Sequence, residues 1–228
     1  QTTLYTTDVL VVGGGGAGIT AAVAAARSGV QVLLVSKGQP GNSGNTIMIG
    51  GSYAMDGDSA HNIYGVEAAD PTFTKEILYQ SIVCDGFFLS DQNMVEQFVE
   101  ESPAIVWEVF QWSQQTGKPF AFGPPATWAM SGNMMGRALR YGLEHTPNID
   151  ILEDVMIVEL LKSGDRVCGA MGIRILDGEL IEIHAKAVVL GTGGFQPFSF
   201  KNTNSDMTGD GPAMAFRAGA RLAAVLHN

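Results

Sequence analysis

The pattern of apolar and polar residues differs between the beginning, the middle and the end of the chain. The first stretch opens with the apolar run Val9–Val12, passes through consecutive glycines into an alanine-rich segment that ends at Gly29, and closes with a second apolar run before Lys37. Short apolar runs rich in β-branched residues are typical of buried parallel strands, and alanine favours helix. Residues 8–37 are therefore predicted to fold as strand, turn, helix and strand.

The middle of the chain has a helical pattern instead. From residue 58 to residue 117, apolar residues recur at helical spacing between prolines and glycines. Asp91 or Ser90 is predicted to cap one of these helices, and Ser102-Pro103 to form the N-cap and first residue of another. Residues 118–139 are predicted to form a loop followed by a helix.

The last part alternates apolar and polar residues, as strands do. Residues 149–194 carry turn signals at Ser163-Gly164 and Asp177-Gly178, which predicts a β-meander followed by a return strand. Together the patterns predict one α/β domain over residues 1–228. It is expected to be Rossmann-like, with a parallel sheet, a β-meander and a helical insertion at about residues 58–145.

Composition excludes several kinds of partner. The 228 residues carry a formal net charge of −10, which argues against nucleic acid and anionic membranes. No run of apolar residues is long enough for a membrane segment, so a cytoplasmic location is expected, although an N-terminal segment could precede Gln1. The two cysteines and four histidines are scattered, which predicts neither a disulfide framework nor a metal site.

The glycines after the first apolar run form a G-x-G-x-x-G motif at Gly13, Gly15 and Gly18. In such a motif the first glycine permits a tight turn, the second lets the backbone approach a pyrophosphate, and the third lets helix and strand pack closely. The turn is therefore predicted to bind a dinucleotide through Gly13, Gly14, Gly15, Gly16, Ala17 and Gly18. NAD is disfavoured, because Ser36-Lys37 occupies the place where a carboxylate would bind the ribose.

The residues after the second strand carry a family resemblance. Ser36-Lys37 and the following GQPGNSGNTIMIGGSYAM resemble the flavoprotein subunits of fumarate reductase and succinate dehydrogenase, L-aspartate oxidase and soluble fumarate reductases. The blocks EDVMIVELL, AKAVVLGTGGFQ and MTGDGPAMAFRAGA match in the same order, so the resemblance runs from Asp8 to about Leu222. It implies the FAD-binding domain of a flavoprotein oxidoreductase that takes part in electron transport.

The resemblance also implies which residues contact FAD. Beyond the glycine turn they are Ser36, Lys37, Asn45, Thr46, Gly50, Gly51, Val155, Met156, Thr192, Gly193, Gly194 and Asp210. For Asp210, which stands between two glycines at a predicted helix start, the alternative is a simple helix cap. Asn45 lies where membrane-bound members carry a histidine that bonds to the flavin. Because an amide cannot form that bond, FAD is expected to be non-covalent.

Catalytic residues stay unassigned. In the family, the proton-donating arginine and the substrate-binding histidines and arginines follow the last matching block, partly within a capping domain, and this domain and the C-terminal part are expected to lie outside this chain. Within the chain, Arg137 and Arg140 are proton-donor candidates, with solvated helix faces as the favoured account of both.

The implied reaction is hydride exchange between flavin N5 and a carbon–carbon bond in a small carboxylate substrate. An alternative is a flavin-binding or electron-transfer subunit that a second polypeptide completes. A nicotinamide-only dehydrogenase and a structural role without cofactor are the less favoured alternatives, the latter because it leaves the glycine turns unexplained.

Overall fold

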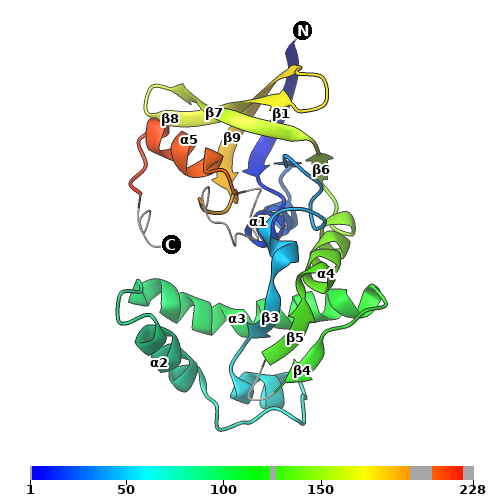
Figure 1. Ribbon diagram of the computed structural model, residues 1–228, viewed down its shortest axis with the longest axis vertical. Coiled ribbons are helices and arrows are strands. Elements are labelled where there is room, and N and C mark those ends of the chain that lie inside the picture. The colour runs from blue at the N-terminus through cyan, green and yellow to red at the C-terminus, as the bar shows by residue number, and fades with distance from the viewer. Residues whose placement is uncertain (1, 124–126, 196–206, 223–228) are drawn as a thin grey trace, which may run out of the picture. The chain divides into compact units, whose positions relative to one another are not determined.

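The computed structural model describes residues 2–123, 127–195 and 207–222 (Figure 1). The chain divides into two compact units. Unit 1 comprises residues 1–49 and 135–228, and unit 2 comprises residues 50–134. The inserted unit therefore begins and ends earlier than the helical insertion that the sequence predicts.

Unit 1 is built on a six-stranded sheet with the order β6-β2-β1-β9-β8-β7. The strands β6, β2, β1 and β9 pair in parallel, and β9, β8 and β7 pair antiparallel, which confirms the predicted parallel sheet and meander. The strands are β1 (Thr2–Val12), β2 (Val32–Val35), β6 (Ile149–Leu152), β7 (Val155–Ser163), β8 (Arg166–Arg174) and β9 (Leu180–Leu190).

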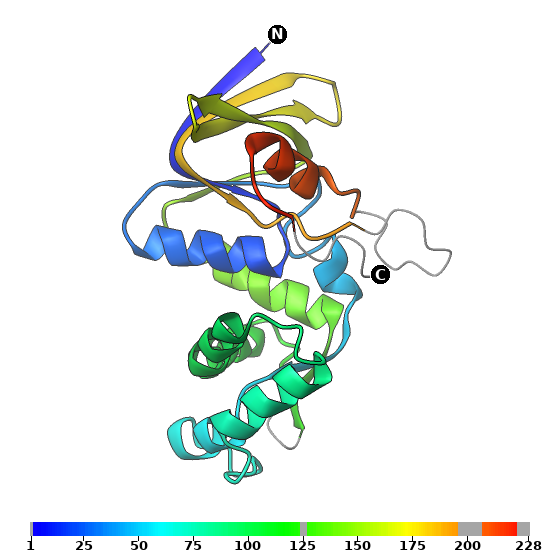
Figure 2. The same cartoon turned by 90° about the vertical axis from the view of Figure 1, so that its left-hand side faces the viewer.

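The two faces of this sheet are covered differently. Helix α1 (Gly16–Arg27) packs against β1 and β2, and it buries Ile19, Ala22 and Val23 (Figure 2). Because side chains alternate along a strand, the neighbouring positions of β1 and β2 point to the other face. There the meander and helix α5 (Asp210–Ala218) enclose a core. It contains Leu10, Val12, Leu33, Val35, Val155, Ile157, Leu160, Ala170, Ile181, Ile183, Ala185 and Met214.

Unit 2 is mainly helical, with a small antiparallel sheet of order β3-β5-β4. Helices α2 and α3 pack against each other around Leu78, Val83, Val95 and Val99. The elements are β3 (Gly50–Ala54), a π-helical turn (Ser59–Ile63), α2 (Lys75–Asp85), α3 (Gln92–Gln115), β4 (Ala121–Gly123) and β5 (Thr127–Ser131). Helix α4 (Gly132–Glu144) follows β5, and its residues from Met135 onward belong to unit 1.

Two predictions for the middle of the chain are wrong. Ser102-Pro103 does not begin a helix, because α3 continues through both residues. A proline inside a helix removes one backbone hydrogen bond, but the buried stripe continues on both sides of it, through Val99 and Val106. Residues 118–139 are not simply a loop and a helix either, since β4 and β5 form there by pairing with each other.

Other local predictions are confirmed. Of the two predicted caps, Asp91 rather than Ser90 caps α3, and it accepts hydrogen bonds from the backbone N–H groups of Asn93 and Met94, at 3.0 and 3.4 Å. The hairpins β7–β8 and β8–β9 turn through Gly164 and Gly178, both with positive φ. None of the helices in the described ranges has both the length and the apolar character needed to cross a bilayer.

Candidate cofactor site

Three turns meet at one edge of the sheet in unit 1. Val12 at the end of β1 pairs with Val35 of β2 on one side and with Leu190 of β9 on the other. Because the three strands are parallel, the segments that follow them, residues 13–18, 36–37 and 191–194, leave the sheet at the same edge. The chain moves from β1 to one neighbour and later returns to the other, which makes this edge a topological switch point, the usual ligand position in such folds.

The backbone of the glycine turn packs closely within the turn itself and against the turn that follows β9. A Cβ atom on Gly18 would lie 1.8 Å from the carbonyl oxygen of Gly13, and one on Gly13 would lie 2.3 Å from that of Gly191. Gly13 also has a φ of +114°, which favours glycine. At Gly16, by contrast, a Cβ would meet no atom closer than 3.8 Å. The motif glycines thus permit helix α1, β1 and the turn after β9 to pack together.

The N-terminus of α1 has backbone donors to offer a ligand. Its N-cap is Gly15, which has no side chain, and the first turn contains no acidic residue. The Gly16 N–H donates to Oγ1 of Thr46 at 3.0 Å. Across the described ranges, no side chain accepts from the N–H of Ala17 or Gly18. Free first-turn N–H groups and the helix dipole suit an anionic ligand such as a pyrophosphate.

Lys37, Thr208 and Asp210 form a polar cluster that joins the end of β2 to the start of α5. Nζ of Lys37 lies 3.0 Å from Oδ2 of Asp210 and donates to Oγ1 of Thr208 at 2.8 Å. Oγ1 of Thr208 in turn donates to Oδ2 of Asp210 at 2.6 Å. The N-cap of α5 is Gly209 rather than Asp210. The carboxylate of Asp210 therefore orients Lys37 instead of serving as the N-cap of the helix.

This cluster predicts a pH dependence of stability. Burial alone would raise the pKa of Asp210, but hydrogen bonds from Thr208 and Lys37 and the charge of Lys37 outweigh it and lower the pKa below the ordinary 3.8. The folded-state pKa is thus depressed, so the ionised carboxylate stabilises the fold above the ordinary value, and this contribution is lost as the pH falls through the folded-state pKa. We expect the wild-type chain to unfold with a larger free energy than Asp210→Asn at neutral pH, and the difference to shrink on acidification. Urea unfolding across the acidic range tests this, and a difference that widens at low pH would contradict it.

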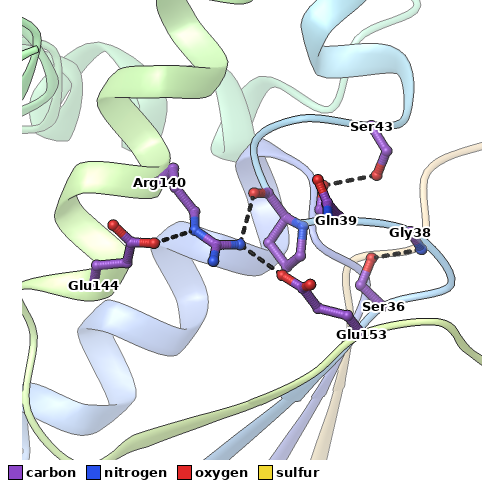
Figure 3. A network of polar contacts seen from close by, with 8 residues as sticks. Ser36, Gly38, Gln39, Ser43, Arg140, Glu144 and Glu153 are labelled. Carbon is purple, nitrogen blue, oxygen red and sulfur yellow. Dashed lines mark hydrogen bonds and ion pairs between the residues drawn. The ribbon is translucent and has the colours of Figure 1, made fainter.

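A second network, centred on Arg140 of α4, holds the loop after β2 (Figure 3). The guanidinium donates through Nε to Glu144 at 2.5 Å, and through Nη1 to Glu153 at 2.7 Å and to the carbonyl oxygen of Pro40 at 3.3 Å. Burial opposes the charge, but Glu153 and Glu144 raise the pKa of Arg140, which keeps it ionised. Arg137 is exposed as expected, whereas the prediction of a solvated face is wrong for Arg140, whose side chain is only 27% exposed.

The same loop touches α4 through backbone. A Cβ on Gly136 would lie 2.0 Å from the carbonyl oxygen of Gly41, which itself has a φ of +75°. Pro40, Gly41 and Gly136 are residues of the site region that the sequence reasoning missed, and it did not predict that Arg140 holds this loop. The available signal was a glycine inside a predicted helix, which lowers helix propensity and often marks a close packing contact.

The structure places most of the residues predicted to contact the cofactor in unit 1. Ser36 is buried, and its Oγ accepts from the Gly38 N–H at 3.4 Å (Figure 3). Its carbonyl oxygen accepts from the N–H of Val155 at 3.1 Å, so β7 begins directly beside the end of β2, with Met156 next in that strand. Asn45 and Thr46 open a short 3₁₀-helix that ends at Met48.

The remaining predicted residues follow β9 or belong to unit 2. Thr192 lies against α5, because a Cβ on Gly211 would meet its Oγ1 at 1.7 Å. Gly193 has positive φ, and Gly194 lies beside Met207. Gly50 and Gly51 belong to β3 in unit 2 and not to unit 1. Among the described residues, no group of three or more His, Cys, Asp or Glu side chains could hold a metal ion.

The fold and the site together define an α/β dinucleotide-binding protein. Comparison with protein families makes this more specific, because residues 8–228 match the family described as the FAD binding domain. The chain belongs to this family, and FAD is its cofactor. The backbone contacts at the glycine turn and the free N–H groups of Ala17 and Gly18 fit the pyrophosphate of such a cofactor.

Curated relatives agree with the family. The chain is 33% identical over 235 residues to the fumarate reductase flavoprotein subunit of Mycobacterium tuberculosis, covering 94% of this chain and 37% of that protein. It is 28% identical over 239 residues to the corresponding protein of a Serratia species, covering 96% of this chain and 37% of that protein. The chain thus spans little more than a third of the length of these relatives.

Solved structures give the same result. The Mycobacterium smegmatis Sdh1 complex in its apo form superposes with a TM-score of 0.81 at 26% identity, over 95% of this chain and 39% of that one. The open conformation of a flavocytochrome c3 fumarate reductase superposes with a TM-score of 0.75 at 29% identity, over 95% of this chain and 41% of that one. These matches confirm the predicted flavoprotein fold and the family resemblance.

Proposed function

We propose that this chain is the FAD-binding part of an oxidoreductase of the fumarate reductase and succinate dehydrogenase type that acts on a small carboxylate substrate. When bound, the flavin would exchange a hydride at N5 with a carbon–carbon bond next to a carboxylate. The observation that carries the proposal is the meeting of three turns at the carboxyl edge of β1, β2 and β9, with the N–H groups of Ala17 and Gly18 available there.

Each part of the site has a role in this proposal. The N–H groups of Ala17 and Gly18 bind the pyrophosphate, and Lys37 adds positive charge at the end of β2, held in place by Asp210. Thr46 ties its own loop to the start of α1. Arg140 does not suit a proton donor, because its guanidinium is already bound to two carboxylates and a carbonyl. Arg140 is thereby removed from the two arginine candidates for the proton donor.

The visible spectrum of the purified chain tests cofactor and linkage together. We expect flavin absorption bands, and we expect acid denaturation to release the colour into solution as FAD, because Asn45 cannot form a covalent bond to the flavin. Colour that stays with the precipitated protein would contradict non-covalent binding. A colourless protein that does not take up added FAD would contradict the assignment of the glycine turn.

A second candidate function is a flavin-binding or electron-transfer subunit that another polypeptide completes. It is favoured by the second half of β9. Residues 187–190 pair with β1 on one side, but within the described ranges they pair with no strand on the other, and Val189 is 37% exposed. An unpaired strand edge with apolar side chains is suited to accept a further strand.

Turnover tests the second candidate. The FAD-loaded chain is supplied with a reduced artificial donor, and the reduction of fumarate is followed. Fumarate reduction by the chain alone would contradict a subunit that needs a second polypeptide. A flavin that the donor reduces, but that does not pass electrons to fumarate, would agree with both candidates, because the residues that bind and protonate the substrate are expected outside this chain.

A further inference from the structure

The turn between α2 and α3 in unit 2 can be followed in Figure 1. It carries three consecutive large apolar residues, and their side chains are exposed. Phe87 is 82% exposed, Phe88 66% and Leu89 80%. We refer to these three residues as the apolar tip. Single exposed apolar residues are ordinary on a protein surface, but two adjacent phenylalanines and a leucine on one tight turn are not. The tip is therefore a candidate contact surface.

The backbone of the tip is held in a fixed and unusual conformation. Phe87 and Phe88 have φ values of +51° and +60°. Residues other than glycine rarely have positive φ, and bulky side chains are especially rare there. The turn is nevertheless fixed by backbone hydrogen bonds of 2.9 Å from Phe87 to Cys84, from Phe88 to Val83 and from Leu89 to Gly86. Strain that the surrounding structure maintains is typical of functional positions, and a fixed turn presents its aromatic rings at low entropic cost.

Further exposed apolar residues lie next to the tip, on helix α3. Met94, Phe98 and Ile105 of α3 are exposed and follow one another at intervals of four and seven residues, so they form one stripe along the helix. Glu101 lies beside this stripe at helical spacing. The stripe begins in the first turn of α3, the helix that follows the tip, and it extends the candidate surface along that helix.

Charge indicates what kind of molecule this surface accepts. Residues 50–134 hold nearly half of the chain's 23 acidic residues, whereas Lys75 and Lys118 are their only lysines or arginines. Asp85 and Asp91 lie on either side of the tip in sequence, and Asp85 is exposed. Such a field repels nucleic acid, anionic lipid and a second copy of the same unit, and it attracts a positively charged surface.

We propose that the apolar tip is a docking site for a polypeptide whose surface carries an apolar pocket rimmed by lysine or arginine. Phe87 and Phe88 fill the pocket, and the surrounding carboxylates of unit 2 pair with the rim. Aromatic anchors surrounded by complementary charge are the usual energetic centre of protein interfaces. This proposal does not depend on FAD or on the reaction, and it would stand if the proposed function failed.

The test measures, by fluorescence anisotropy, binding of a labelled helical-hairpin peptide that has a leucine-lined groove between its helices and lysines along the rim of that groove. The variant carries Phe87→Asn and Phe88→Asn, because asparagine tolerates positive φ and keeps the turn. The control carries Ile175→Ser and Leu176→Ser, at another apolar turn, in unit 1, whose two side chains are 53% and 79% exposed. We expect the tip variant to lose at least about tenfold in affinity, the control to bind like wild type, and added salt to weaken wild-type binding.

Several results would overturn the proposal. One is a tip variant that binds the peptide as tightly as wild type. Another is equal binding of a matched peptide with glutamate in place of lysine, which would remove the charge argument. Self-association in sedimentation equilibrium that the tip variant abolishes would identify a second copy as the occupant. Co-sedimentation with phosphatidylserine vesicles that depends on the tip would identify a membrane instead.

Discussion

Replacing Gly18 with alanine is expected to abolish FAD binding and to lower the free energy of unfolding by about 3 kcal/mol. The added Cβ would lie 1.8 Å from the carbonyl oxygen of Gly13, which is far inside van der Waals contact. The partner is backbone in a turn that also touches Gly191, so no side-chain rotation can relieve the clash. Helix α1 must therefore move away from β1, and the N–H groups at its start move with it.

Gly16→Ala is the matched control for this experiment. It makes the same chemical change in the same turn, but its Cβ would meet no protein atom closer than 3.8 Å. Because alanine restricts the unfolded chain and favours helix, we expect stability to be unchanged or raised by up to about 1 kcal/mol. Urea unfolding measures both variants, and flavin content after gel filtration compares Gly18→Ala with wild type, because Gly16 is itself a predicted FAD contact. If Gly18→Ala were as stable as Gly16→Ala and kept the flavin content of wild type, the close packing of α1 on β1 would be refuted.

The part of the fold that could be predicted from sequence is the part in which local signals agree. Between Asp8 and Lys37, an apolar run, a glycine turn, an alanine-rich helix and a second run all lie in one continuous segment, and each favours the same structure. The hairpin turns at Gly164 and Gly178 are likewise encoded by the residues of the turns themselves. These elements can be assigned without knowing any contact between residues that are far apart in the sequence.

The remainder depends on contacts between residues far apart in the sequence. Arg140 binds the carbonyl oxygen of Pro40, which is 100 residues away, and no local pattern indicates that pairing. The short strand β5 exists because it pairs with β3 and β4, whereas its own sequence resembles a loop. At Pro103 a strong local signal for a helix start is overridden, because burial of the stripe on both sides favours one continuous helix.

Gly136→Ala is a substitution for which sequence alone and the structure predict opposite changes in stability. Glycine inside a helix is less favourable than alanine by roughly 1 kcal/mol, so helix propensity predicts that the substitution in α4 stabilises the protein. In the structure, however, the new Cβ would lie 2.0 Å from the carbonyl oxygen of Gly41 and 2.9 Å from Cγ2 of Ile47. We therefore expect a loss of about 2 kcal/mol in the free energy of unfolding.

The loop that carries Gly41 gives this substitution a functional consequence as well. Arg140, one turn further along α4, binds Pro40, so displacing the loop also separates the guanidinium from that carbonyl (Figure 3). Because the loop continues to Thr46, which bonds to the start of α1, we expect weaker FAD binding in addition to lower stability. Arg137→Ala, at an exposed position of the same helix, should change the free energy of unfolding by no more than about 0.5 kcal/mol and leave the flavin in place. A stabilised Gly136→Ala with full flavin content would show that helix propensity outweighs the contact and that the loop does not rest on α4.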